Sequence, residues 1–120
     1  MSSIADVTIG LPVRNGEQYI ADAIESVLRQ THADLRMVIA DNASTDRTEE
    51  ICRDHARRDS RVTYHRHPTN IGAGPNFDFT YRMAAGSPFF RWMAHDDLLS
   101  PTCLERSVAA LRANPAATVC

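Results

Sequence analysis

The sequence predicts a single α/β domain built around a mainly parallel sheet. Along the chain, short apolar runs of strand length alternate with segments whose apolar residues recur at helical spacing. Such alternation is typical of units in which right-handed crossover helices join parallel strands. The chain has 120 residues, which is enough for one domain with a core of its own and too few for two.

Four apolar segments have the length of strands, and a fifth is expected near the end of the chain. The first, 7–13, and the second, 35–40, are almost wholly apolar, as expected of strands buried on both faces. The third, 62–66, alternates apolar with polar residues, which indicates a more exposed strand near a sheet edge. The last two are predicted over 89–94 and from 117–119 onward.

The segments between the strands carry helical patterns. The second helix is expected to start within 44–46, because Asp46 with a glutamate three residues on resembles a capping box. The third is expected over 75–85, and the fourth from an N-cap at Ser100 with Pro101 at its first position. The first helix has a clear apolar face, which consists of Ile20, Ala23, Ile24, Val27 and Leu28.

Composition narrows the classes of protein and of partner. Hydrophobic residues make up 43% and charged residues 23% of the chain, which is typical of a folded globular domain. With a net charge of −2 we expect no nucleic-acid partner. No apolar run approaches the ~18–20 residues of a membrane span, and the first residues lack the features of a signal peptide. We therefore expect a cytoplasmic protein.

Polar clusters follow the predicted strands directly. They comprise residues 14–16, 41–44, 70–74 and 95–97, one cluster after each of the first four strands. Because parallel strands end at the same edge of a sheet, these clusters should meet there. Open α/β sheets bind ligands at that edge, where the strand order reverses. The sequence thus places a candidate site without identifying its ligand.

Asp96 and Asp97 carry the clearest chemical signal. Adjacent carboxylates repel each other unless a cation compensates their charge. Mg²⁺ or Mn²⁺ is the natural partner, because such ions take one or two carboxylates and complete their shell with water and phosphate oxygens. The alternative is a solvated loop in which Asp97 helps to start the following helix.

Two further clusters admit both a binding and a structural interpretation. Asp41 ends an apolar strand, and its carboxylate can accept hydrogen bonds from a base or a ribose; the alternative is a simple turn. The glycines of 70–76 let a ligand approach the backbone closely. This segment lacks the lysine and the glycine spacing of the common phosphate-binding loops. His95 is expected to support the site rather than to act as a base.

Five segments together resemble a known family. They are 7–15, which includes the first strand, 23–31 at the end of the first helix, 38–46, 70–72, and 95–97 followed by Pro101. In this order and spacing they resemble the N-terminal half of the family 2 glycosyltransferases. The resemblance covers about residues 6–115 and implies the GT-A fold, a Rossmann-like three-layer α/β/α arrangement. We expect the sheet to be truncated, with 1–120 forming a single domain that binds the nucleotide sugar.

The resemblance implies transfer of a sugar from a nucleoside diphosphate sugar to an acceptor, with inversion at the anomeric carbon. The segment that holds Pro12, Arg14 and Asn15 matches the loop lining the nucleotide pocket. Asp41 matches the acidic residue that contacts base or ribose. The residues expected to bind the nucleotide sugar are Pro12, Arg14, Asn15, Asp41, Asn42, Asn70, Gly72 and Asp96.

The resemblance also implies a metal site. Asp97 matches the carboxylate nearest a Mg²⁺ or Mn²⁺ ion, with Asp96 near the ribose or in the metal's shell. Such an ion would bridge both phosphates and stabilise the leaving nucleoside diphosphate. One departure bears on this site: Ala94 stands where many members have a further aspartate. A second departure bears on the nucleotide, because Asn42 also stands where many members have an aspartate; its amide can still form a hydrogen bond to a base edge.

The remaining machinery is expected elsewhere. An inverting transfer needs a carboxylate that takes the acceptor's proton, and we expect this general base beyond Cys120, with the acceptor-binding half. The acceptor is a saccharide, a lipid-linked molecule or a protein, and docking of the full-length protein at the cytoplasmic face of a membrane stays open. An unpaired sheet edge predicts self-association. The rival interpretations are a non-catalytic binding module and a nucleotidyltransferase.

Overall fold

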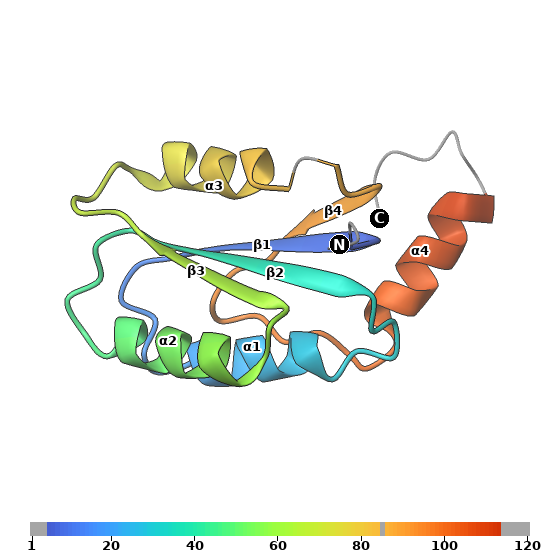
Figure 1. The fold of residues 1–120 in the computed structure, drawn as a ribbon, viewed down its shortest axis with the longest axis horizontal. Coiled ribbons are helices and arrows are strands. Elements are labelled where there is room, and N and C mark those ends of the chain that lie inside the picture. Colours follow the sequence, from blue (N-terminus) through green and yellow to red (C-terminus); the bar gives the residue numbers. More distant parts are fainter. Residues whose placement is uncertain (1–4, 85, 114–120) are drawn as a thin grey trace.

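The computed structural model describes residues 5–84 and 86–113 and shows a parallel sheet between helices (Figure 1). Strands and helices alternate as the sequence predicts. Along the chain, the elements are β1 (Val7–Val13), α1 (Ile20–Leu28), β2 (Leu35–Asp41), α2 (Thr48–Arg58), β3 (Val62–Arg66), α3 (Ala73–Arg82), β4 (Phe89–Trp92) and α4 (Cys103–Ala113).

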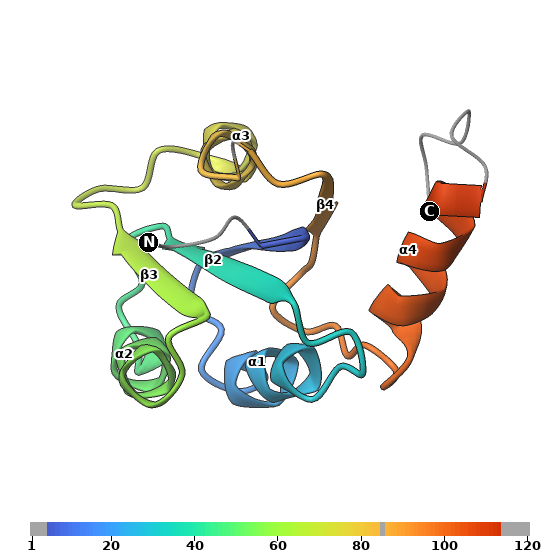
Figure 2. The same ribbon diagram turned by 45° about the vertical axis from the view of Figure 1, so that its right-hand side comes forward.

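The four strands form one sheet in the order β3-β2-β1-β4, and all three pairings are parallel. Figure 2 shows α1 and α2 on one face and α3 on the other, with α4 beyond the β4 edge. The predicted three-layer arrangement is therefore confirmed, and β3 is an edge strand as expected. The chain returns from β3 across the sheet to β4, so the strand order reverses between β1 and β4.

The core lies around the two central strands. All residues of β1 are buried, as are all but one of β2, which explains why both segments are nearly continuous apolar runs. The apolar face of α1 packs beneath them, with Ile20, Ile24 and Val27 fully buried. Each such side chain stabilises the fold by about 1.5–3 kcal/mol relative to an exposed one.

Helix α3 approaches the sheet closely because β1 has a glycine at its centre. A Cβ atom on Gly10 would lie 2.6 Å from Thr80 Oγ1 and 2.7 Å from the Phe90 ring. Thr80 is itself completely buried, so its side chain has no room to move aside. Any side chain at position 10 would therefore push α3 away from the sheet. The start of α3 would be displaced with it.

The start of α2 differs from the sequence prediction. The helix begins at Thr48, not within 44–46. Asp46 accepts a bond from the Thr48 backbone N–H at 3.0 Å, but Glu49 forms an ion pair with Arg53 instead of reaching back to the cap. The predicted capping box is therefore wrong, because the carboxylate of Asp46 closes a two-residue turn before the helix.

Other boundaries shift by a few residues. Helix α3 begins at Ala73, since Gly72 turns the chain with a φ of 92° and proline is tolerated in a first helical turn. Helix α4 begins at Cys103, because residues from Ser100 form a turn in which the Cys103 N–H donates to the Ser100 carbonyl at 3.0 Å. Strand β4 ends at Trp92. The fifth predicted strand, 117–119, lies outside the described residues.

The cysteines that the structure describes are free thiols, and one of them packs in the core. Cys52 and Cys103 are free, and burial, with the nearby charges of Asp41 and Asp46, raises the pKa of Cys52 to about 12. The Cys52 thiol is therefore protonated and serves packing.

Within residues 5–84 and 86–113, no helix has the length and apolarity to cross a lipid bilayer.

Candidate functional site

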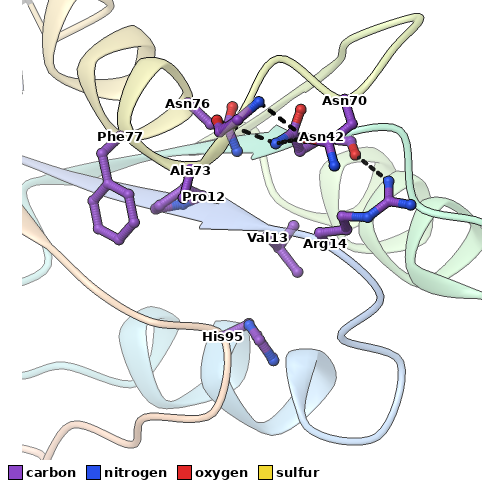
Figure 3. Close-up of a pocket in the computed structure, with 10 residues that line it drawn as sticks. Pro12, Val13, Arg14, Asn42, Asn70, Ala73, Asn76, Phe77 and His95 are labelled. Carbon is purple, nitrogen blue, oxygen red and sulfur yellow. Dashed lines mark hydrogen bonds between the residues drawn. The ribbon is translucent and has the colours of Figure 1, made fainter.

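A pocket of about 350 Å³ opens beyond the carboxyl ends of the strands (Figure 3). This is the location predicted from the polar clusters, and its size is typical of sites for small molecules. Its walls come from the end of β1, the loops after β2, β3 and β4, and the start of α3. Five of its lining residues belong to the predicted set, namely Pro12, Arg14, Asn42, Asn70 and Gly72.

The structure also adds and omits residues relative to the prediction. Asn15, Asp41, Asp96 and Asp97 do not line the pocket. Five other residues line the pocket but were not predicted from the sequence to bind the nucleotide sugar: Val13, Ala73, Asn76, Phe77 and His95.

Arg14 supplies positive charge to the pocket. Its Nη1 donates to the backbone carbonyls of Asn42 at 2.8 Å and Ala43 at 2.9 Å, so its bonding partners are neutral. Of the ten lining residues, only Arg14 carries a permanent charge. The pocket is therefore suited to an anionic ligand.

Asn15 serves the loops rather than the pocket. Its φ of 52° lies in the left-handed region, which asparagine tolerates better than most residues. Its backbone N–H donates to Ser44 Oγ at 2.8 Å, and its Oδ1 accepts from the Thr45 N–H at 2.8 Å. Asn15 thereby ties the loop after β1 to the loop after β2.

Asn42 holds one wall of the pocket. Its Nδ2 donates to Asn70 Oδ1 at 2.8 Å and to the Gly72 carbonyl at 3.3 Å (Figure 3). Its Oδ1 accepts from the Ile71 N–H at 2.8 Å. Both ends of the carboxamide are thus bonded to 70–72. A bond from Asn42 to a base edge, as considered from the sequence, would have to share these groups.

Asn76 forms the floor beside this wall. It is only 2% exposed, its Nδ2 donates to the Ala40 carbonyl at 2.9 Å, and its Oδ1 lies 2.9 Å from His67 Nε2. The latter bond requires the proton of the imidazole on Nε2. The sequence holds one signal for this role of Asn76, namely an asparagine within a predicted helix. Asparagine is unfavourable in helix interiors unless its side chain is hydrogen-bonded.

Asp41 is completely buried, and its carboxylate is already bonded. Oδ1 accepts from the Ser44 N–H at 2.9 Å, and Oδ2 accepts from the Tyr64 hydroxyl at 2.6 Å and from Arg66 at 3.3 Å. Burial of the Tyr64 hydroxyl raises its pKa most, and the hydrogen bond to Asp41 raises it further. The hydroxyl therefore remains a donor. Contact between Asp41 and a base or ribose stays a prediction, and because Asp41 is completely buried, it requires the groups that cover the carboxylate to move.

Asp96 and Asp97 lie exposed in the loop after β4, next to the lining residue His95. Asp97 Oδ2 accepts from the Ala94 N–H at 3.3 Å, and neither carboxylate forms an ion pair with any residue that the structure describes. Since α4 begins only at Cys103, Asp97 does not start that helix. That part of the structural alternative is wrong, and the pair remains free for a cation.

The Asp pair offers few protein ligands for the expected metal. No three His, Cys, Asp or Glu side chains gather as ligands among residues 5–84 and 86–113. Two adjacent, solvent-exposed carboxylates nevertheless fit Mg²⁺ or Mn²⁺, which commonly retain waters and take their other ligands from phosphates. A site of this kind would be completed by the ligand in the pocket.

His95 faces the β1 loop because position 16 has no side chain. A Cβ on Gly16 would lie 2.9 Å from His95 Cδ2 and 2.7 Å from Val13 Cγ2. The Gly16 N–H also donates to the buried Thr48 hydroxyl at 2.9 Å. Gly16 therefore leaves room for the imidazole at the edge of the pocket.

A parallel sheet in the order β3-β2-β1-β4 with a polar pocket at its switch point defines a Rossmann-like ligand-binding domain. The profile of glycosyl transferase family 2 matches residues 8–120, and the chain belongs to that family. An uncharacterized glycosyltransferase of Rickettsia typhi is 30% identical over 105 residues, which cover 88% of this chain and 31% of the relative. The uncharacterized glycosyltransferase EpsJ of Bacillus subtilis is 31% identical over 100 residues, covering 83% and 28%. This chain thus spans about a third of the length of these relatives.

Solved structures show the same fold. The S. aureus TarS fragment 1–349 in complex with UDP-GlcNAc superposes with a TM-score of 0.82 at 22% identity, covering 92% of this chain and 32% of that one. The mannosyltransferase PcManGT of Pyrobaculum calidifontis, in complex with GDP-Man and Mn²⁺, gives a TM-score of 0.80 at 22% identity, covering 92% and 33%. The predicted GT-A fold is confirmed.

Proposed function

We propose that this chain is the donor-binding domain of a metal-assisted glycosyltransferase. The enzyme transfers a sugar from a nucleoside diphosphate sugar to an acceptor, with inversion at the anomeric carbon. The observation that carries the proposal is the pocket at the switch point, with Arg14 in its wall and Asp96 and Asp97 beside it. Membership of the family supports it, as do the UDP-GlcNAc and GDP-Man complexes of TarS and PcManGT.

The residues divide the task by their chemistry. The amides of Asn42, Asn70 and Asn76 hold the walls around the nucleoside, and Arg14 attracts the diphosphate. Asp96 and Asp97 would hold Mg²⁺ or Mn²⁺, with Asp97 nearer the ion. When bound, the ion neutralises charge that develops on the departing nucleoside diphosphate.

We propose that residues outside the described part of the protein supply the general base and the acceptor site. The carboxylate that takes the acceptor's proton is expected beyond Cys120, together with the residues that bind a saccharide, a lipid-linked acceptor or a protein. Self-association through the edge strands β3 or β4 and a cytoplasmic location stay predictions. So does the alternative of a non-catalytic module, which requires no cation at the Asp pair.

Calorimetric titration of the chain with UDP, GDP and dTDP, each with and without Mn²⁺, tests the proposal. We expect one diphosphate to bind about tenfold more tightly, or better, with Mn²⁺. The matching monophosphate should gain little from the ion, since it lacks the second phosphate group, whose charge the ion would help to neutralise. Failure of all three diphosphates to bind a chain with a dispersed NMR spectrum would overturn the proposal.

A further inference from the structure

The end of α1 holds the segment that follows the Asp pair. Gln30, one residue beyond the C-cap of α1, is only 4% exposed. Its Nε2 donates to the Ser100 carbonyl at 2.6 Å and to the Ser26 carbonyl at 3.1 Å, and its Oε1 accepts from the Leu104 N–H at 3.0 Å. The carboxamide therefore uses both of its donors and its acceptor.

Two neighbours extend this attachment. Ser26 Oγ accepts from the Leu99 N–H at 3.2 Å and donates to the Ala23 carbonyl at 2.8 Å. The Thr31 N–H donates to the Pro101 carbonyl at 2.9 Å. These bonds satisfy backbone groups of an irregular segment that would otherwise need water as their partner.

Hydrogen bonds fix both ends of the loop that carries the candidate metal ligands. At its start, the Met93 N–H donates to the Gly10 carbonyl of β1 at 2.9 Å. At its far end, Leu99 is bonded to Ser26 and packs against the core. Asp97 lies only two residues before that second anchor. A shift of Leu99 would therefore move Asp97, although none of these anchoring groups lines the pocket.

We propose that Gln30, with Ser26, positions Asp96 and Asp97 for the cation and the diphosphate. Gln30 is a positioning residue, because it acts on the carboxylates through the backbone of 99–104 and touches no ligand. The inference rests on the proposed function of the Asp pair. It assigns a role to the serine and glutamine at the end of α1, which the sequence showed only as part of a motif.

Gln30→Leu tests the inference, because leucine has a similar volume and forms none of the three bonds. We expect the affinity for the diphosphate in Mn²⁺ to fall about tenfold, because the two carboxylates lose their fixed position. Affinity in EDTA should change less than about twofold. Backbone amide exchange at Leu104, read by NMR, should accelerate. The matched control is Gln18→Leu, at an exposed position before α1.

Ser26→Ala provides a milder variant that keeps Gln30 and suits a helix, so it remains informative where Gln30→Leu fails to fold. It should lower the Mn²⁺-dependent affinity by about threefold and accelerate exchange at Leu99. Equal losses with and without Mn²⁺ would indicate a purely structural role and overturn the inference. Unchanged affinity despite faster exchange would do the same. Absence of Mn²⁺-linked binding in the unmodified chain would instead refute the proposed function, and the inference with it.

Discussion

Asp97→Asn is expected to abolish the Mn²⁺-dependent part of nucleotide binding while the chain stays folded. The change removes one charge and almost no volume from an exposed side chain, so the free energy of unfolding should shift by no more than about 0.5 kcal/mol. A neutral amide is a much poorer ligand for a hard cation than a carboxylate. We therefore expect the affinity in Mn²⁺ to fall to the value measured in EDTA, as read by calorimetry.

Comparison with two other variants makes this result specific. Asp96→Asn should weaken Mn²⁺-linked binding less than Asp97→Asn, since Asp97 is proposed to lie nearer the ion. Asp34→Asn is the control, because Asp34 is exposed just before β2, at the opposite end of the sheet. Mn²⁺-linked binding that survives in Asp97→Asn at wild-type strength would show that the ion is held elsewhere.

The second large effect is expected at Asn42. Asn42→Ala removes the three hydrogen bonds that attach 70–72 to the loop after β2. Because 70–72 is exposed, water can replace the lost partners, so we expect a cost in stability of only about 1 kcal/mol. The pocket wall, however, loses its fixed position. Nucleotide affinity should fall about tenfold both with and without Mn²⁺.

This pattern separates Asn42 from Asp97, whose replacement should act only in the presence of the ion. Calorimetry in Mn²⁺ and in EDTA, with urea unfolding alongside, measures both effects. Thr69→Ala is the matched control, as it removes an exposed polar side chain from the same connection. Wild-type affinity in a folded Asn42→Ala variant would mean that the wall is held without this carboxamide.

The order and type of the elements follow from the sequence because apolar periodicity reports burial directly. Val7–Val13 and Leu35–Asp41 are mostly apolar because helices cover both faces of the central strands. Element boundaries were less predictable, because single polar contacts decide them. Asp46 bonds to Thr48 and delays α2, and the positive φ of Gly72 lets α3 begin before Pro75.

The topology of the sheet brings five of the eight predicted nucleotide-sugar-binding residues together at one pocket. Arg14, Asn42 and Gly72 come from different loops and meet because parallel strands end at one edge of the sheet. The sequence did not reveal where buried polar side chains point. Asp41 turns toward Tyr64 instead of the pocket, and a strand buried on both faces has no polar alternation that would show this. Asn76 was not predicted because its two bonding partners, Ala40 and His67, are distant from it in the sequence and come close only in the fold.

Chemical-shift mapping of the nitrogen-15-labelled chain with the tightest diphosphate and Mg²⁺, which is diamagnetic, tests the central claim most directly. A second cavity, lined by residues between Tyr81 and Phe90, lies toward the amino end of β4 and serves as the internal comparison. We predict that the largest shifts fall on residues 12–16, 70–77 and 95–97, at the carboxyl ends of the strands. Shifts confined to 81–90, or spread without preference over the surface, would contradict the claim that this edge of the sheet is the donor site.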